Sequence, residues 1–183
     1  MIIRSRSAGD LDRCAAVAEA VYAVDGYPAY LPGQVRPGVL RSFLDVADAH
    51  AAWVAEEDGD IVGHVALHAH GSGPVMDLAG RATGRPAEAL AVVARLLVAP
   101  QLRRSGAGRA LLEVASEEAT ARRLWPVLDV AVFLRGAVGL YESAGWRCAG
   151  EVSVPLPDGR VLEELVYVGP PPPDAAPPLS GSH

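Results

Sequence analysis

The chain has 183 residues, half of them apolar, and carries a formal net charge of −6. This length and composition predict a globular protein with a substantial core. The acidic balance argues against a general nucleic-acid-binding protein, because such proteins are usually basic. No apolar run approaches the roughly 18 residues of a membrane-spanning helix, and the N-terminus lacks a signal-peptide pattern. We therefore expect a cytoplasmic protein that partners neither nucleic acid nor a membrane.

The chain has two cysteines, Cys14 and Cys148, which are far apart in the sequence. This spacing predicts neither a disulfide framework nor a zinc site, and no metal is expected. Both side chains are expected to be small hydrophobic residues of the core.

Hydrophobic periodicity and turn residues divide the chain into strands and helices. Helical spacing begins at Asp10, and Asp25-Gly26 with Pro28 is expected to end that helix. A turn over 58–60 indicates a hairpin. The expected strands are 2–3, 51–56, 61–70, 91–98, 127–133, 146–154 and 161–168, and the expected helices are 10–24, 40–44, 75–82, 106–123 and 136–144.

This order of elements predicts a mixed α/β sheet rather than a regular βαβ array. Residues 1–168 are expected to form the folded domain. The Pro-rich residues 169–183 predict an extended, mobile tail, because they can neither bury a core nor hold a ladder.

Residues 98–109, VAPQLRRSGAGR, combine glycines and arginines where a strand leads into a helix. The start of a helix has free backbone N–H groups and a partial positive charge. Glycine lets that backbone approach a ligand closely, and Arg103, Arg104 and Arg109 add charge. The segment predicts an anion site, and a diphosphate suits it best. The alternative is a plain helix start with solvated arginines.

Three phosphate-binding motifs compete for this segment. A Walker loop is excluded, because the chain contains no lysine. A dinucleotide fingerprint is disfavoured, because its third glycine is Leu111 here and the turn lies past the middle of the chain. The third motif is Arg or Gln, any two residues, Gly, any residue, then Gly or Ala, and residues 103–108 match it in full.

Residues 98–112 resemble the coenzyme-A-binding segment of the GNAT superfamily of N-acetyltransferases. A second resemblance lies in residues 128–151, where that family has a strand, a helix with the pattern A-x-x-L-Y-E, and a Gly-aromatic pair. The matching residues are Ala137, Leu140, Tyr141, Glu142, Gly145 and Trp146. The resemblance covers roughly residues 2–168. It implies an α/β fold with a mixed, mostly antiparallel sheet of about seven strands flanked by helices.

The resemblance implies an N-acetyltransferase in which a primary amine directly attacks the thioester of acetyl-CoA, the co-substrate. It places the donor against the main chain of Leu96, Leu97 and Val98 and against the turn that follows. The turn residues are Arg103, Arg104, Ser105, Gly106, Ala107, Gly108 and Arg109. One departure is Leu134, where the family often has an Asn that bonds the pantetheine arm.

Tyr141 is the candidate acid for the departing thiolate. Its phenol, with a pKa of about 10, suits a thiol with a pKa of about 8.5. The alternative is a core tyrosine. The identity of the general base stays open, because the strand before the turn contains no acidic residue. Glu88 precedes that strand, and His64, His68 and His70 are evenly spaced on the hairpin.

The resemblance places acceptor specificity in the loop after the first helix and in the late hairpin. Asp25 is expected to bind a cationic small-molecule amine between Tyr27 and Tyr30, with His64 nearby. The other expectation for these tyrosines is that they cover the first helix. One of Glu163 and Glu164 should face inward.

Arg95 interrupts an apolar strand and is expected to face solvent or a carboxylate, as a structural anchor of the acceptor loop. The fold also allows a homodimer. A non-catalytic acyl-CoA-binding or regulatory domain stays open as a second reading, motivated by Leu134 and the missing acid. A nicotinamide-binding fold is a third.

Overall fold

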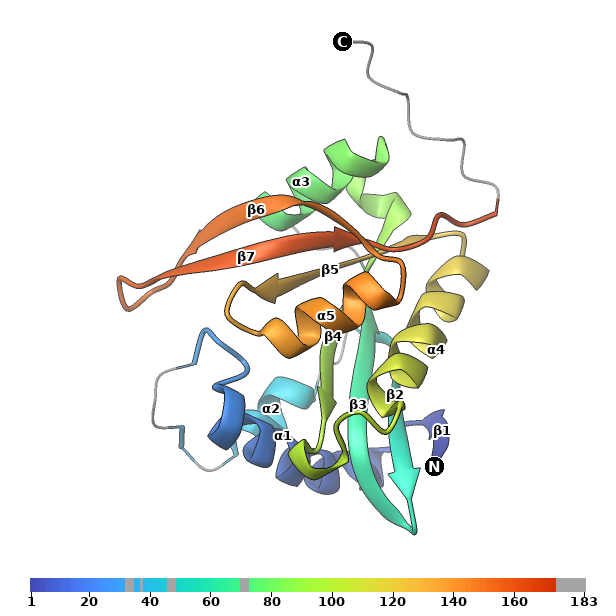
Figure 1. The fold of residues 1–183 in the computed structure, drawn as a ribbon, viewed down its shortest axis with the longest axis vertical. Coiled ribbons are helices and arrows are strands. Elements are labelled where there is room, and N and C mark those ends of the chain that lie inside the picture. Colours follow the sequence, from blue (N-terminus) through green and yellow to red (C-terminus); the bar gives the residue numbers. More distant parts are fainter. Residues whose placement is uncertain (32–34, 37, 46–48, 70–72, 174–183) are drawn as a thin grey trace. The chain divides into compact units, whose positions relative to one another are not determined.

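The computed structural model describes residues 1–31, 35–36, 38–45, 49–69 and 73–173. His70 and most of the predicted tail, residues 174–183, lie outside the described residues. The elements, shown in Figure 1, are β1 Ile2–Ser5, α1 Leu11–Asp25, α2 Val39–Leu44, β2 Ala49–Glu57, β3 Asp60–His68, α3 Pro74–Thr83, β4 Leu90–Val98, α4 Ala107–Ala121, β5 Trp125–Ala131, α5 Arg135–Ser143, β6 Arg147–Pro155 and β7 Val161–Val168.

The strands form a seven-stranded sheet in the order β1-β2-β3-β4-β5-β7-β6. Strands β1 and β2, β2 and β3, β5 and β7, and β6 and β7 pair antiparallel, whereas β4 and β5 pair in parallel. The predicted mixed sheet with flanking helices is therefore confirmed. The chain divides into two compact units, one of residues 1–68 and 93–115 and the other of residues 69–92 and those after 115.

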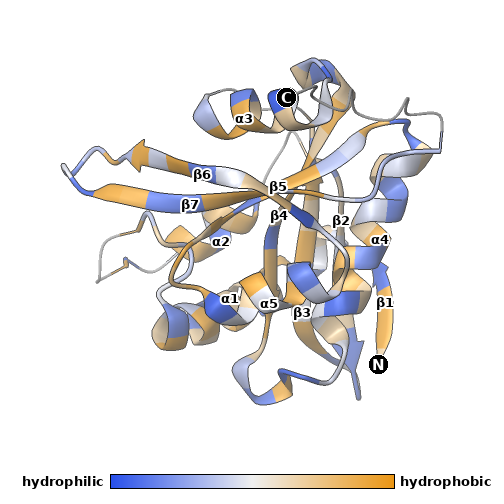
Figure 2. Cartoon of the chain, turned by 45° about the horizontal axis from the view of Figure 1, so that its top comes forward, coloured by the Kyte–Doolittle hydropathy of each residue, from blue (hydrophilic) through white to orange (hydrophobic). Residues whose placement is uncertain are grey.

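In the first unit, α1 packs against α2 and β3. Figure 2 shows hydrophobic and hydrophilic colours alternating along α1, as expected of a helix with one buried face. The chain enters α1 through a 3-10 turn, Ala8–Asp10, in which the Asp10 carboxylate accepts hydrogen bonds from Ser7. Asp10 therefore closes this turn. It also stands at the N-cap of α1, but its side chain makes no capping hydrogen bond to that helix.

An ion pair fixes the same carboxylate. Arg4 Nη1 lies 2.7 Å from Asp10 Oδ2, and this contact holds the pKa of Asp10 well below its usual range. Helix α1 ends where predicted, because Gly26 is left-handed and its N–H donates to the Tyr22 carbonyl.

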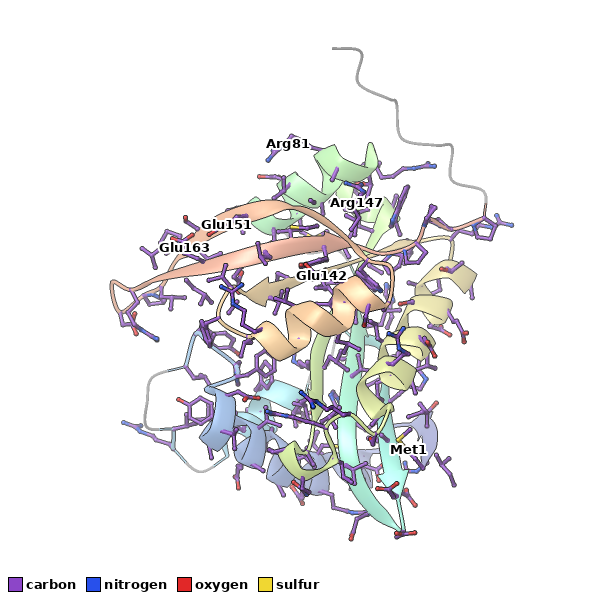
Figure 3. The ribbon with its side chains drawn as sticks, in the orientation of Figure 1. Met1, Arg81, Glu142, Arg147, Glu151 and Glu163 are labelled. Carbon is purple, nitrogen blue, oxygen red and sulfur yellow. The ribbon has the colours of Figure 1, made fainter. Side chains whose placement is uncertain are left out.

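The second unit has its own hydrophobic core, to which α3, β4, β5 and β7 contribute. The buried members are Met76, Ala79, Leu90, Trp125, Val127, Val166 and Val168. Helix α3 packs against β6 and β7. The Arg147 side chain, labelled in Figure 3, donates to the Ala82 carbonyl of α3 at 3.1 Å. Helix α5 ends at the predicted Gly-aromatic pair, because Gly145 is left-handed and the Trp146 N–H donates to the Tyr141 carbonyl.

Cys14 is buried as predicted, but Cys148 is exposed. The prediction for Cys148 was wrong because β6 is the last strand of the sheet and most of its residues alternate between exposed and half-buried. Within the part of the chain that the structure describes, no helix is long and apolar enough to cross a membrane.

Candidate active site

Strand β4 leaves its partner β5 partway along its length. Leu90, Ala91 and Val92 pair with residues 125–127 of β5, and the ladder ends there. The stretch from Leu96 to Val98 therefore has no described ladder pair on β5. At the end of β4, the Ala99 N–H donates to the Val62 carbonyl of β3 at 2.8 Å, so this end is held from the β3 side. Main-chain groups on the other edge are what an extended ligand arm would need for strand-like pairing.

The glycine-rich turn follows directly. A short 3-10 turn, Pro100–Leu102, leads to Arg104 and Gly106, which have φ of 67° and 94°. A side chain at Gly106 would meet open space, so the left-handed backbone rather than crowding requires glycine there. Helix α4 begins at Ala107, one residue after the predicted start, and the Ala107 N–H lies 3.4 Å from Ser105 Oγ.

The charges around this turn differ in their surroundings. Arg104 and Ser105 are exposed, whereas Gly108 and Arg109 are half-buried in the first turn of α4. Arg103 forms an ion pair with Asp25, the last residue of α1. The structure thus brings together two residues predicted for different ligands, Arg103 for the diphosphate and Asp25 for the amine. A ligand at either one would compete with this exposed pair, and such pairs are weak.

The predicted acceptor tyrosines gather on a third ring. Tyr27 and Tyr30 meet Phe43 of α2 edge-on, with ring centroids 5.9 Å and 6.2 Å away. Tyr30 is 48% exposed, so part of this aromatic cluster reaches solvent. The Arg95 guanidinium lies over the Phe43 ring, 4.9 Å from its centroid. A cation of the protein itself therefore already lies on this cluster.

His64 is fully buried on β3. Its Nδ1 lies 3.1 Å from the Arg95 carbonyl, which can only accept, so Nδ1 carries the proton. Its Nε2 then accepts from Arg6 Nη1 at 3.3 Å. Burial lowers the pKa of His64 to about 4, so the ring is neutral at physiological pH. An acceptor could touch this ring only after the surrounding side chains moved.

Two of the candidate bases, Glu88 and His68, lie in different surroundings. Glu88 is exposed on a 3-10 turn before β4. His68 is half-buried and accepts from the Arg95 guanidinium. Arg95 thus faces a histidine and a carbonyl, because its Nε donates to the Phe43 carbonyl.

Tyr141 lies in the second unit, on α5, and is 6% exposed. Its ring packs on Trp146 and Tyr167, with centroids 6.2 Å and 5.8 Å away. The Tyr167 hydroxyl donates to Glu142 Oε1, 3.1 Å away, and Figure 3 shows Glu142 on α5. Burial raises the pKa of Tyr141, and the negative charge of Asp129 raises it further. The phenol therefore keeps its proton at neutral pH, and it is a weaker acid than a free tyrosine.

Asp129 is a functional candidate that sequence reasoning missed. It is the one exposed residue of β5, whose other members are buried. Its carboxyl is hydrogen-bonded to that of Glu164 on β7. Asp129 pairs with Val166 and Ala131 pairs with Glu164, so the two carboxyl groups are diagonal neighbours on one face.

Neither member of this carboxyl pair ionises easily. Loss of hydration raises the pKa of Asp129, although its side chain still reaches solvent. Loss of hydration raises the pKa of Glu164 to about 7, and the charge of Asp129 adds to that. A carboxyl group such as Glu164, with a pKa near neutral pH, suits general base chemistry. The signal that could have identified Asp129 is a lone acid inside an otherwise apolar strand.

The late hairpin separates its two glutamates as predicted. Glu163 accepts a hydrogen bond of 2.6 Å from Ser153 of β6, whereas Glu164 faces Asp129. Figure 3 labels Glu163 on this hairpin. Within the described residues, no group of three or more His, Cys, Asp or Glu side chains is arranged to hold a metal ion.

Comparisons with known proteins bear on the family and the fold of the chain. The sequence model described as the acetyltransferase (GNAT) family matches residues 21–146. No curated protein matches the chain. Among solved structures, a ribosomal-protein-alanine N-acetyltransferase from Brucella melitensis is 23% identical with a TM-score of 0.68, over 92% of this chain and 99% of that one.

Two further structures resemble the chain over nearly their whole length. The ribosomal-protein-S18-alanine N-acetyltransferase of Escherichia coli is 20% identical with a TM-score of 0.61, over 91% of each chain. The protein yncA of Salmonella typhimurium, whose structure contains its cofactor acetyl-CoA, is 19% identical with a TM-score of 0.66, over 98% of each chain. At these identities the likeness establishes the fold.

Proposed function

The chain belongs to the acetyltransferase (GNAT) family, and from that premise we propose that it transfers an acetyl group from acetyl-CoA to a primary amine of a small molecule. The observation that carries this proposal is the junction of β4 and α4. There a strand stretch outside the β5 ladder runs into a left-handed, arginine-bearing turn that opens a helix. Such a junction offers main-chain pairing to an extended arm and N–H groups to a diphosphate.

The donor would be held by the main chain of Leu96, Leu97 and Val98 and by the turn from Arg103 to Arg109. The residues fit a large anion, because Arg104 and Ser105 are exposed and Gly106 leaves open space beside the helix start. Arg103 would leave its ion pair with Asp25 and bind the diphosphate instead. Bound acetyl-CoA supplies an acyl group activated as a thioester.

Side chains of the protein would then accept and donate the protons of the reaction. We assign Asp129, with Glu164 beside it, as the base that takes a proton from the attacking amine. Tyr141 would give its proton to the departing thiolate sulfur. A bond forms between the amine nitrogen and the acyl carbon, the carbon–sulfur bond breaks, and each proton has a named carrier. For the carboxyl pair the support is its raised pKa. For Tyr141 the support is that its phenol holds a proton at neutral pH.

On the acceptor side we keep Asp25, Tyr27 and Tyr30, and Tyr30 offers the most exposed surface of the aromatic cluster. His64 is the least accessible of the proposed acceptor residues, because it is fully buried. Asp25 favours an amine that arrives as a cation.

A non-catalytic acyl-CoA-binding domain is the second candidate. The observation that favours it is Leu134, which occupies the N-cap of α5 without a side-chain hydrogen bond. An Asn there could cap the helix or bond a ligand, and leucine can do neither.

The test measures thiol release from acetyl-CoA with a panel of polyamines, aminoglycosides, amino acids and peptides that begin with alanine. Turnover with any of these amines supports the enzyme, whereas tight coenzyme A binding without turnover across the panel supports the binding domain. Tyr141→Phe should lower kcat by about a hundredfold or more, within the range of general acid catalysis, while coenzyme A still binds. An unchanged kcat across pH would remove Tyr141 from the mechanism.

Gly106→Glu tests the location of the donor site in the same experiment. The substitution puts negative charge and a side chain into a left-handed position at the start of α4, so coenzyme A binding should be lost under either reading. Retained affinity would mean that the diphosphate binds elsewhere.

A further inference from the structure

Arg95 has a backbone conformation that its neighbours must impose. Four described residues other than glycine have a positive φ. Of these, Arg95, with a φ of 54°, is the one that lies inside a strand. The others, Asp58, Arg104 and Arg123, lie in turns. A left-handed conformation is unfavourable for a residue with a Cβ, so it persists where surrounding contacts hold it.

The Arg95 carbonyl is held by a buried histidine. With a positive φ inside β4, this carbonyl accepts from His64 Nδ1 at 3.1 Å. The other ring nitrogen of His64 accepts from Arg6. His64 therefore links the irregular point of β4 to the segment that follows β1.

The Arg95 side chain reaches the end of α2. Its Nε donates to the Phe43 carbonyl, its guanidinium contacts His68, and its Cζ lies 4.9 Å from the centre of the Phe43 ring. Arg6 donates to the next carbonyl, that of Leu44. Two cations thus bind the last carbonyls of α2, where the helix dipole favours positive charge.

Helix α2 depends on such contacts. It has six residues, Val39–Leu44, far fewer than an isolated helix needs to persist in water. Phe43 at its end carries the edge contacts of Tyr27 and Tyr30. The aromatic cluster therefore contacts β4 through Phe43 and the Arg95 guanidinium that lies over its ring.

We propose that Arg95 is a positioning residue that holds α2 and the aromatic cluster Tyr27–Tyr30–Phe43 against β4. The loop assigned to the acceptor and the strand assigned to the thioester would then keep a fixed relation within the first unit. The inference deepens the proposed function and rests on it for the role of this loop as the acceptor side. The physical attachment itself can be tested without any acceptor.

The first measurement follows the ionisation of Tyr30 in protein labelled with carbon-13 at the tyrosine Cζ, with the signal assigned by Tyr30→Phe. In the native protein, burial raises the pKa of Tyr30 and the Arg95 charge opposes this. Arg95→Met removes the charge, so the pKa would rise further if the loop stayed in place. If Arg95 holds the loop, the released Tyr30 gains water and its pKa falls toward about 10. A fall supports the proposal, and a rise or no change overturns it.

The second measurement is hydrogen exchange of the Ser42 and Asp45 amides, which donate to the Gly38 and Arg41 carbonyls in α2. In Arg95→Met they should exchange about tenfold faster or more, because α2 opens locally. Unchanged protection would overturn the proposal. Arg95→Gly is the second variant, because glycine tolerates the left-handed backbone while losing the side chain.

Arg122→Met is the matched control, because Arg122 is exposed and pairs with Glu118 on α4. It should change neither the Tyr30 titration nor the exchange in α2. The Trp146 amide of the second unit, which donates to the Tyr141 carbonyl, should keep its native exchange rate in both Arg95 variants, which shows that the protein is folded. Failure of the acetyltransferase proposal would appear as an absence of turnover in the native protein and would leave these measurements unaffected.

Discussion

The carboxyl pair of Asp129 and Glu164 bears most directly on catalysis at the scale of single residues. If the Asp129–Glu164 pair supplies the base, the rate should fall as pH drops through about 7, because Glu164, whose pKa is raised to about 7, then holds a proton. Glu164→Gln removes the group whose pKa is raised to about 7, so the acid limb of kcat/KM at that pH should be lost. The measurement is a pH profile of thiol release for both proteins.

Glu163→Gln is the control for that profile. Its carboxylate bonds Ser153, on the other face of β7 from Glu164, so its loss should leave the acid limb in place. An acid limb that stays put in Glu164→Gln would show that the pair does not serve as the base.

His64 predicts a pH dependence of stability. Its pKa is about 4 in the folded protein against 6.5 without burial, so the unfolded chain binds the extra proton between these values. Stability should therefore fall as pH falls from about 7 toward 4. Linkage gives a loss of about 2 kcal/mol between pH 7 and pH 5 from this one group. Urea unfolding at the two pH values measures it.

His64→Asn keeps a donor near the position of Nδ1 and cannot titrate, so this variant should lose less stability between pH 7 and pH 5. The control is His50→Asn, because His50 is exposed on β2 and should leave the native pH dependence unchanged. An equal pH dependence in native protein and His64→Asn would mean that protonation of His64 does not lower the free energy of unfolding.

At the scale of elements, Gly63 shows how closely β3 approaches its neighbours in the first unit. A Cβ there would lie 2.9 Å from Leu111 Cδ1 of α4 and 3.0 Å from the Leu97 carbonyl of β4. The carbonyl is main chain and cannot turn aside. Gly63→Ala should therefore destabilise the protein by about 1–3 kcal/mol, as overpacking does. The free energy of unfolding in urea measures this.

Gly139→Ala provides the comparison. A Cβ at this position in α5 would have no neighbour within 4 Å, so alanine should stabilise the helix by about 0.5–1 kcal/mol. If Gly63→Ala behaved like Gly139→Ala, β3 and α4 would have more room than the distances indicate.

At the scale of the whole molecule, periodicity and turn residues predicted the order of the elements and the mixed sheet. The start of α4 and the end of α5 were found closely, because glycines in left-handed conformations mark both. These signals are local in the chain. The assignments of Tyr141, the diphosphate turn and the acceptor residues stay predictions.

Contacts between distant residues could not be predicted from the sequence. The pairing of Asp129 with Glu164 depends on the register of β5 on β7, and the pairing of Arg103 with Asp25 depends on where α1 ends. The left-handed backbone of Arg95 depends on His64, which is 31 residues earlier in the chain. A linear pattern encodes none of these, because each needs two segments placed side by side.

The division into two units has a consequence for the order in which the protein is made. The chain passes between the units after His68, within β4 after Val92 and within α4 after Ala115. Synthesis runs from the N-terminus, so the first unit has all its residues once Ala115 has left the ribosome. The second unit must wait for β7, which pairs with both β5 and β6. Every residue proposed to hold the donor is therefore synthesised, within a complete unit, before Tyr141 exists.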